Sequence, residues 1–183
     1  MTNFIHKQMI DKKLCDKLIK YFENSDKKFK GTTGPEIYDP KLKQTTEVYF
    51  TPQDNPFEEY ATELKNVISE YTKKYKYSDH TQNAWRLDPI IKIQKYSKGE
   101  GYHVWHNENT GSPDTNKRHL VFMTYLNDVI KGGGETGFLY QKLKIKPKKG
   151  LTLVWPAIWT HTHKGHIVKS DKYIITGYYN YNE

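Results

Sequence analysis

The chain has 183 residues, of which 36% are hydrophobic and 14% aromatic, enough to bury the core of one domain. Its single cysteine, Cys15, excludes an internal disulfide and any zinc site built from several cysteines. The net charge of +8 is weak evidence for a nucleic-acid partner, because only Arg86 and Arg118 are arginines and the lysines are dispersed. With no long apolar run and no secretory signal pattern, we expect an intracellular, cytoplasmic protein that is neither secreted nor membrane-bound.

Two amphipathic helices are predicted within residues 1–84. Residues 11–25 carry apolar side chains at helical spacing behind Asp11, which is a favourable N-cap. The second helix begins near Asn55 as the cap, with Pro56 in the first helical position and Glu58 completing a capping box. Its apolar stripe consists of Tyr60, Leu64, Val67, Ile68 and Tyr71.

From about residue 85 the apolar period changes from helical to alternating, which is typical of short strands. Gly, Asn, Asp, Ser and Pro occupy the breaks between them, and no break has a helical pattern, so we expect antiparallel strands in a sandwich or barrel. We predict one mainly β (α+β) domain over residues 1–183, with 1–84 forming helices and an entering strand, and 85–183 the core. The predicted strands are residues 88–96, 101–108, 118–127, 137–147, 150–156 and 172–181.

One predicted strand carries a potential metal-binding pair. Side chains two apart on a strand face the same way, so His106 and Glu108 can converge on one ion. His161, His163 and His166 offer a third ligand, and two histidines with one carboxylate form the facial triad of non-haem Fe(II) oxygenases. Taken alone, a His-x-Glu pair is common by chance, and satisfied surface or core histidines are the simpler interpretation.

The order of several motifs resembles a known family. "IQKYSKGEGYHVWHNE", "TYLNDV", "GGGETGF", "THTHKG" and "DKYIITGYY" follow one another as in the 2-oxoglutarate- and Fe(II)-dependent dioxygenases, in particular the prolyl-4-hydroxylase-like branch and a phage and bacterial group within it. The resemblance covers residues 85–181 and implies a double-stranded β-helix core of the jelly-roll or cupin type with N-terminal supporting helices. It also implies Fe(II), 2-oxoglutarate and O2, with ascorbate as a candidate reductant, and the host cytoplasm if the chain is viral.

The resemblance assigns the metal ligands to His106, Glu108 and His163. His163 is preferred to His161 because it lies nine residues before Lys172, the spacing that the family shows between its distal histidine and a basic residue. Glu108 is a departure, since Asp is the commoner residue, and its longer side chain has to fold back to reach the same ion.

The remaining site residues also follow from the resemblance. Lys172 would pair with the distal carboxylate of 2-oxoglutarate, with Tyr96 and Tyr125 beside it. Arg118 would lie near the substrate entrance, although a surface role explains it equally well. Trp105 and Trp159 are candidates for the substrate channel because they flank the ligand segments, and buried packing explains them at least as well. The "GGGETGF" segment is interpreted as a structural turn, because no P-loop Lys-Ser/Thr follows it.

The implied reaction is hydroxylation of a substrate C–H bond, with a prolyl residue of a peptide or protein as the leading substrate. A free amino acid or other small molecule, another protein side chain and a modified nucleobase stay open as substrates, as does a non-enzymatic basic β-sandwich that binds nucleic acid. A cupin-like zinc or manganese enzyme is a third alternative, which leaves Lys172 and Tyr125 without a role. Oligomeric state does not follow from the sequence.

Overall fold

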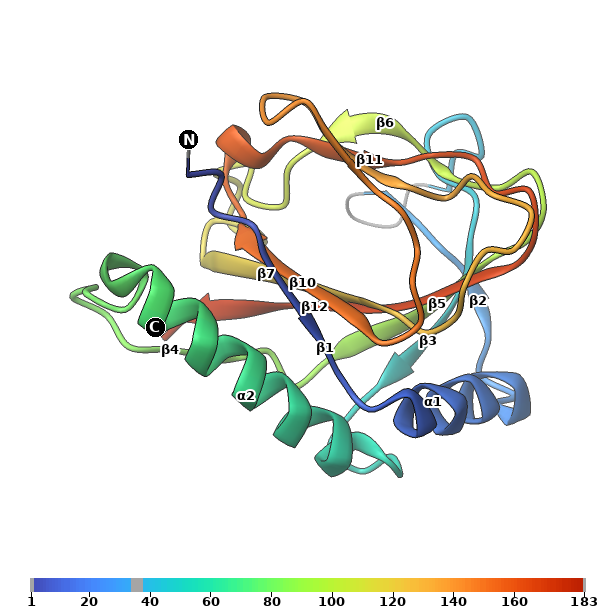
Figure 1. Ribbon diagram of the computed structural model, residues 1–183, viewed down its shortest axis with the longest axis horizontal. Coiled ribbons are helices and arrows are strands. Elements are labelled where there is room, and N and C mark those ends of the chain that lie inside the picture. Colours follow the sequence, from blue (N-terminus) through green and yellow to red (C-terminus); the bar gives the residue numbers. More distant parts are fainter. Residues whose placement is uncertain (1, 34–37, 183) are drawn as a thin grey trace.

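Two antiparallel sheets face each other in the computed structural model, and two helices cover the outer face of the larger sheet (Figure 1). The structure describes residues 2–33 and 38–182. Every pairing between its strands is antiparallel, as the alternating pattern predicts. The larger sheet has the order β1 (His6–Met9), β10 (Leu151–Pro156), β7 (Arg118–Tyr125), β12 (Lys172–Tyr181), β5 (Ile91–Tyr96), β3 (Thr46–Phe50) and β2 (Phe29–Lys30), with β4 (Trp85–Leu87) also paired to β12. The smaller sheet has the order β6 (Tyr102–His106), β11 (His163–Gly165), β8 (Thr136–Phe138) and β9 (Leu143–Ile145).

The two predicted helices are present, with one difference at a start. Helix α1 (Lys12–Asn24) begins after Asp11, whose carboxylate accepts a hydrogen bond from the Lys13 N–H at 2.9 Å, as the capping pattern predicts. Helix α2 (Phe57–Lys74) starts one residue later than predicted, and no side chain caps it. The preceding turn satisfies the first helical N–H instead, because the Phe57 N–H donates to the Asp54 carbonyl at 2.8 Å.

The helices and the outer face of the larger sheet share one apolar core. Leu18 and Phe22 of α1 and Tyr60 of α2 are at most 1% exposed and pack with sheet residues such as Phe122 and Ile175. Burial of these side chains is the main driving force that holds the helices on the sheet. Neither described helix has the length and apolar character needed to cross a bilayer.

Two of the predicted strands need correction, and the short strands β1, β2 and β4 were not predicted. The predicted strand 137–147 is a hairpin of β8 and β9, because Lys142 adopts a positive φ of 49° and reverses the chain. The predicted strand 101–108 ends at His106, so Glu108 lies in the following loop. β1 pairs with β10. It has only four residues, His6–Met9, and so short a segment gives no clear hydrophobic pattern in the sequence. Short 3₁₀ turns occupy Lys76–Ser78 (η1) and Trp159–His161 (η2).

Candidate metal centre and cosubstrate pocket

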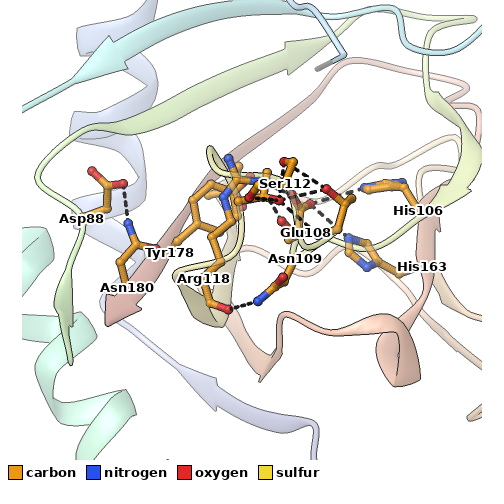
Figure 2. Close-up of polar contacts among 12 residues, drawn as sticks. Asp88, His106, Glu108, Asn109, Ser112, Arg118, His163, Tyr178 and Asn180 are labelled. Carbon is orange, nitrogen blue, oxygen red and sulfur yellow. Dashed lines mark hydrogen bonds and ion pairs between the residues drawn. The ribbon is translucent and has the colours of Figure 1, made fainter. Parts of the chain in front are cut away.

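The two predicted histidine ligands lie on neighbouring strands of the smaller sheet. His106 ends β6 and His163 begins β11, and the two residues are direct partners in the antiparallel pairing. Glu108 reaches the same point from the loop after β6, with its Oε1 atom 3.4 Å from His106 Nε2 and 3.5 Å from His163 Nε2 (Figure 2). The nitrogen and carboxylate ligand atoms all lie within 4.8 Å of one another.

The loop that carries Glu108 is fixed by backbone hydrogen bonds. The N–H groups of Glu108 and Asn109 both donate to the Ala157 carbonyl, at 3.0 and 2.9 Å. Ala157 directly follows β10, so the larger sheet anchors the loop. Alternation along one strand therefore does not explain why His106 and Glu108 converge. The two side chains converge because the loop after β6 is hydrogen-bonded to Ala157, about 50 residues further along the chain. The local sequence around Glu108 does not indicate this contact.

Both histidines present a metal-binding nitrogen to the site. His106 Nδ1 lies 3.1 Å from the Val104 carbonyl and His163 Nδ1 lies 2.9 Å from the His161 carbonyl. A carbonyl only accepts hydrogen bonds, so each Nδ1 carries the proton and each Nε2 keeps a lone pair that faces Glu108. This backbone contact is the usual way in which a protein orients a histidine ligand, and the donor set therefore fits a divalent metal ion.

The pKa shifts of His106 and Glu108 also favour metal binding. Burial, and next the neighbouring His163, lower the pKa of His106. Burial alone would raise the pKa of Glu108, but the adjacent His106 and His163 side chains hold it well below its usual range. Neutral imidazoles and an ionised carboxylate are the forms that bind a metal cation.

Aromatic rings fix the orientation of the two imidazoles. Tyr102 stacks on His106, with ring centroids 3.7 Å apart and planes inclined by 15°. Trp155 meets His163 edge-on at 5.1 Å. Trp155 is 2% exposed, and its indole N–H has no hydrogen-bond partner among the described residues. Neither Tyr102 nor Trp155 was predicted from the sequence as part of the site.

The other two candidate histidines point elsewhere. His161 Nε2 lies 2.9 Å from the Asn3 carbonyl, and its Nδ1 lies 3.0 Å from the Thr160 hydroxyl. His161 therefore ties η2 to the N-terminal segment, and only its backbone carbonyl contacts His163. His166 is half-buried beyond the end of β11. The structure thus brings His163, rather than His161 or His166, to the predicted pair.

A cavity of about 790 Å³ between the two sheets contains the three candidate ligands and reaches Lys172. Lys172 is 2% exposed, its ammonium donates to the Gly134 carbonyl at 3.1 Å, and none of the described carboxylates pairs with it. Burial lowers its pKa to about 8. A buried cation without a described acidic partner fits an anionic ligand.

Gly134 belongs to the predicted glycine-rich turn. There Gly133 has a φ of +78°, and any Cβ on Gly133 would lie 2.3 Å from the Ile167 carbonyl oxygen.

The two predicted cosubstrate tyrosines differ in position. Tyr96 lines the cavity, its ring centre lies 4.5 Å from Lys172 Nζ, and its hydroxyl donates to Gln94 at 3.1 Å. Tyr125 lies behind the cavity wall, where its hydroxyl contacts Thr136 Oγ1 at 2.6 Å and donates to the Ile145 carbonyl at 3.1 Å. Thr136 completes the cavity wall there, and it was not predicted from the sequence.

The three residues predicted near the substrate are also distributed differently. Arg118 lines the cavity but turns toward Glu108. Trp105 is 41% exposed and packs against the Lys164 ammonium, and Trp159 is 63% exposed and packs edge-on against Tyr140. Neither tryptophan is among the cavity-lining residues. Trp105 points away because it alternates with His106 on β6.

Several known proteins resemble this chain in sequence or in fold. A model of the 2OG-Fe(II) oxygenase superfamily matches residues 91–180. A collagen prolyl hydroxylase of Paramecium bursaria Chlorella virus 1, solved with 2OG, is 22% identical, with a TM-score of 0.68 over 96% of this chain and 95% of that one. A Pseudomonas putida prolyl-4-hydroxylase is 15% identical, with a TM-score of 0.73 over 100% and 95% of the two chains. A Trichoplax adhaerens prolyl hydroxylase, solved with a hypoxia-inducible-factor peptide, is 15% identical, with a TM-score of 0.76 over 98% and 84%. At these identities the similarity shows a common fold. No curated protein sequence matches the chain.

Proposed function

Because this chain belongs to the 2OG-Fe(II) oxygenase superfamily, we propose that it hydroxylates a prolyl residue of a peptide, with Fe(II) held by His106, Glu108 and His163. The observation that carries the proposal is the convergence of two histidine Nε2 atoms and one carboxylate oxygen inside a cavity that also contains a buried lysine with no ion pair to a described carboxylate. Two imidazoles and one carboxylate are the donor set that non-haem Fe(II) oxygenases use.

The metal and its cosubstrates supply the oxidative chemistry. When bound, Fe(II) couples the decarboxylation of 2-oxoglutarate by O2, which yields succinate and CO2, to the oxidation of a substrate C–H bond. The protein binds and orients the reactants and excludes water from them. Lys172 would bind the distal carboxylate of 2-oxoglutarate, and Tyr96 would pack beside it. Apolar side chains close the cavity around these groups, namely Val121, Met123, Trp155 and Ile174.

The choice of a peptide substrate is supported by the shape of the cavity and by the structural neighbours. Exposed side chains at Ile90, Thr110, Ser112 and Asp114 line one end of the cavity, so the cavity opens to solvent where a side chain of a larger molecule can enter. The viral neighbour is a collagen prolyl hydroxylase. The Trichoplax neighbour is a prolyl hydroxylase in complex with a hypoxia-inducible-factor peptide.

The proposal is tested by succinate release. Wild-type protein with Fe(II), 2-oxoglutarate and ascorbate is incubated with pools of proline-containing peptides, free amino acids and oligonucleotides, and succinate and product masses are measured. We expect succinate above the uncoupled background, and one added oxygen atom on proline, only with the peptide pool. Matched peptides with Pro→Ala and the His106→Ala protein serve as controls and should release background succinate.

Two results would contradict the proposal. Turnover of the amino acids or oligonucleotides without turnover of the peptides would overturn the choice of substrate. Background succinate with every pool, from protein that binds Fe(II) and 2-oxoglutarate, would overturn hydroxylation of any of these three classes.

A further inference from the structure

The two oxygens of the Glu108 carboxylate have different surroundings. Oε1 faces the histidine pair, at 3.4 and 3.5 Å from their Nε2 atoms. Oε2 points the other way, accepts a hydrogen bond from the Tyr178 hydroxyl at 2.8 Å and contacts Arg118 Nη1 at 3.3 Å (Figure 2). One oxygen is thus directed to the metal position, and protein donors occupy the other.

This arrangement addresses a difficulty that a glutamate ligand creates. Glu has one more rotatable bond than Asp, so holding its carboxylate in a single position costs more conformational entropy. A freely turning carboxylate could also present either oxygen, or both, to the metal. A donor that occupies only Oε2 removes both sources of variation.

The donors are themselves held rigidly by the larger sheet. Tyr178 lies on β12 and Arg118 at the start of β7, and these central strands pair along most of their length. The Arg118 guanidinium lies 3.9 Å from the centre of the Tyr178 ring, and its Nη1 also donates to the Glu108 carbonyl at 2.9 Å. Asn109, next to Glu108, donates to the Arg118 carbonyl at 3.0 Å.

We propose that Tyr178 is a positioning residue that holds Oε2 of Glu108, with Arg118 as its partner, so that Oε1 alone is presented to the metal. This inference rests on the proposed function, because it assumes that Glu108 binds the metal. It also gives Arg118 a different role from the substrate contact predicted from the sequence. A shorter aspartate, whose carboxylate would end roughly 1.5 Å earlier, would not reach Tyr178 from this backbone position.

The test measures binding of Mn(II) alone, by EPR of the free and bound ion, so that it does not depend on turnover. Tyr178→Phe removes one hydroxyl and keeps the ring against which Arg118 packs. Tyr179→Phe is the matched control, because Tyr179 is the next residue of β12 and faces the helix-covered core. Thermal unfolding of each variant shows whether the fold is kept.

We expect Tyr178→Phe to weaken Mn(II) affinity about tenfold, the range typical of groups that orient a metal ligand, and to change the EPR line shape of the bound ion. Tyr179→Phe should leave both unchanged. In the Glu108→Asp background, where the hydroxyl has no carboxylate to hold, Tyr178→Phe should cause no further loss of affinity.

Each contrary outcome has a distinct meaning. Unchanged Mn(II) affinity in Tyr178→Phe, with normal binding by the wild type, would overturn this inference and leave the proposed function standing. An equal loss in the wild-type and Glu108→Asp backgrounds would show that Tyr178 does not act through Glu108, and would overturn it as well. Failure of the wild type to bind Mn(II) or Fe(II) would overturn the proposed function and this inference together.

Discussion

The two faces of the larger sheet have different roles, although the same strands form both. On β12, Ile175 and Tyr179 face outward into the core shared with the helices, whereas Lys172 and Tyr178 face inward to the cavity. The outward face is apolar and closely packed. The inward face combines apolar side chains with polar and charged ones, and it contains a buried cation that none of the described carboxylates pairs with. Alternation along one strand thus lets stability and ligand binding vary separately, and substitutions on the two faces should have opposite consequences.

The largest expected effect lies on the outward face. Phe122 is fully buried and packs against Tyr60 and Tyr179, with ring centroids 6.2 and 6.0 Å apart. Phe122→Ala should lower the free energy of unfolding by about 3–5 kcal/mol through lost burial and the remaining cavity. Urea unfolding measures this loss. At a temperature where the variant stays folded, 2-oxoglutarate affinity should be unchanged, and a loss of affinity there would show that the two faces are not independent.

The inward face should give the reverse result. Lys172→Met removes a buried ammonium and keeps an apolar stem of similar length, so 2-oxoglutarate affinity should fall about 10- to 100-fold, as for the loss of a charge-assisted hydrogen bond. Stability should stay the same or rise, because the free protein no longer buries an unpaired charge. Calorimetric titration of the Mn(II)-loaded protein and urea unfolding give the two values. Unchanged affinity would exclude Lys172 from the 2-oxoglutarate site.

A smaller effect should follow from pH. The ammonium of Lys172 has a pKa lowered to about 8 by burial, and only the charged form pairs with a carboxylate. The dissociation constant for 2-oxoglutarate should therefore be flat below pH 8 and rise about tenfold by pH 9. In the free protein, the unfolded chain binds the Lys172 proton more tightly than the folded one, so this residue adds stability as pH rises from about 8 toward 10.5. Lys172→Arg stays charged and should give a flat binding profile; the same rise in that variant would assign the effect to another group.

The smallest predicted effect is again structural. Asp11→Ala removes the side-chain cap of α1 and should cost about 1 kcal/mol in the free energy of unfolding. Asp11→Asn, which can still accept the Lys13 N–H, is the matched control and should lose less. Metal and 2-oxoglutarate affinities should not change in either variant. A change in metal affinity would show that the helix layer influences the opposite face of the sheet.

The sequence predicted the fold class and the approximate strands because hydrophobic periodicity is a local signal. The helix from Lys12 and the strands after residue 85 carry that signal clearly. It did not predict the hairpin between β8 and β9, which depends on a positive φ at Lys142, or the short strand β1. These features are decided by turn geometry and by pairing with distant strands.

For the candidate site, the sequence indicated most of the residues but not how their side chains are oriented. His106, Glu108, His163 and Lys172 were selected through spacing and family resemblance, and the structure places all four in one cavity. The orientation of Arg118 toward Glu108 and the position of Tyr125 behind Thr136 depend on packing between distant strands, which spacing does not encode. Tyr178 could have been found, because it alternates with Lys172, Ile174 and Thr176 on the same strand face.

The central claim is that His106, Glu108 and His163 bind Fe(II) and that His161 does not. Anaerobic titration of the protein with Fe(II) and 2-oxoglutarate, followed by visible absorption, tests it most directly. We predict a weak charge-transfer band of the chelated ketoacid in the wild type and in His161→Ala, and no band in His106→Ala or His163→Ala. An unchanged band in His163→Ala, or a band lost only in His161→Ala, would contradict the account.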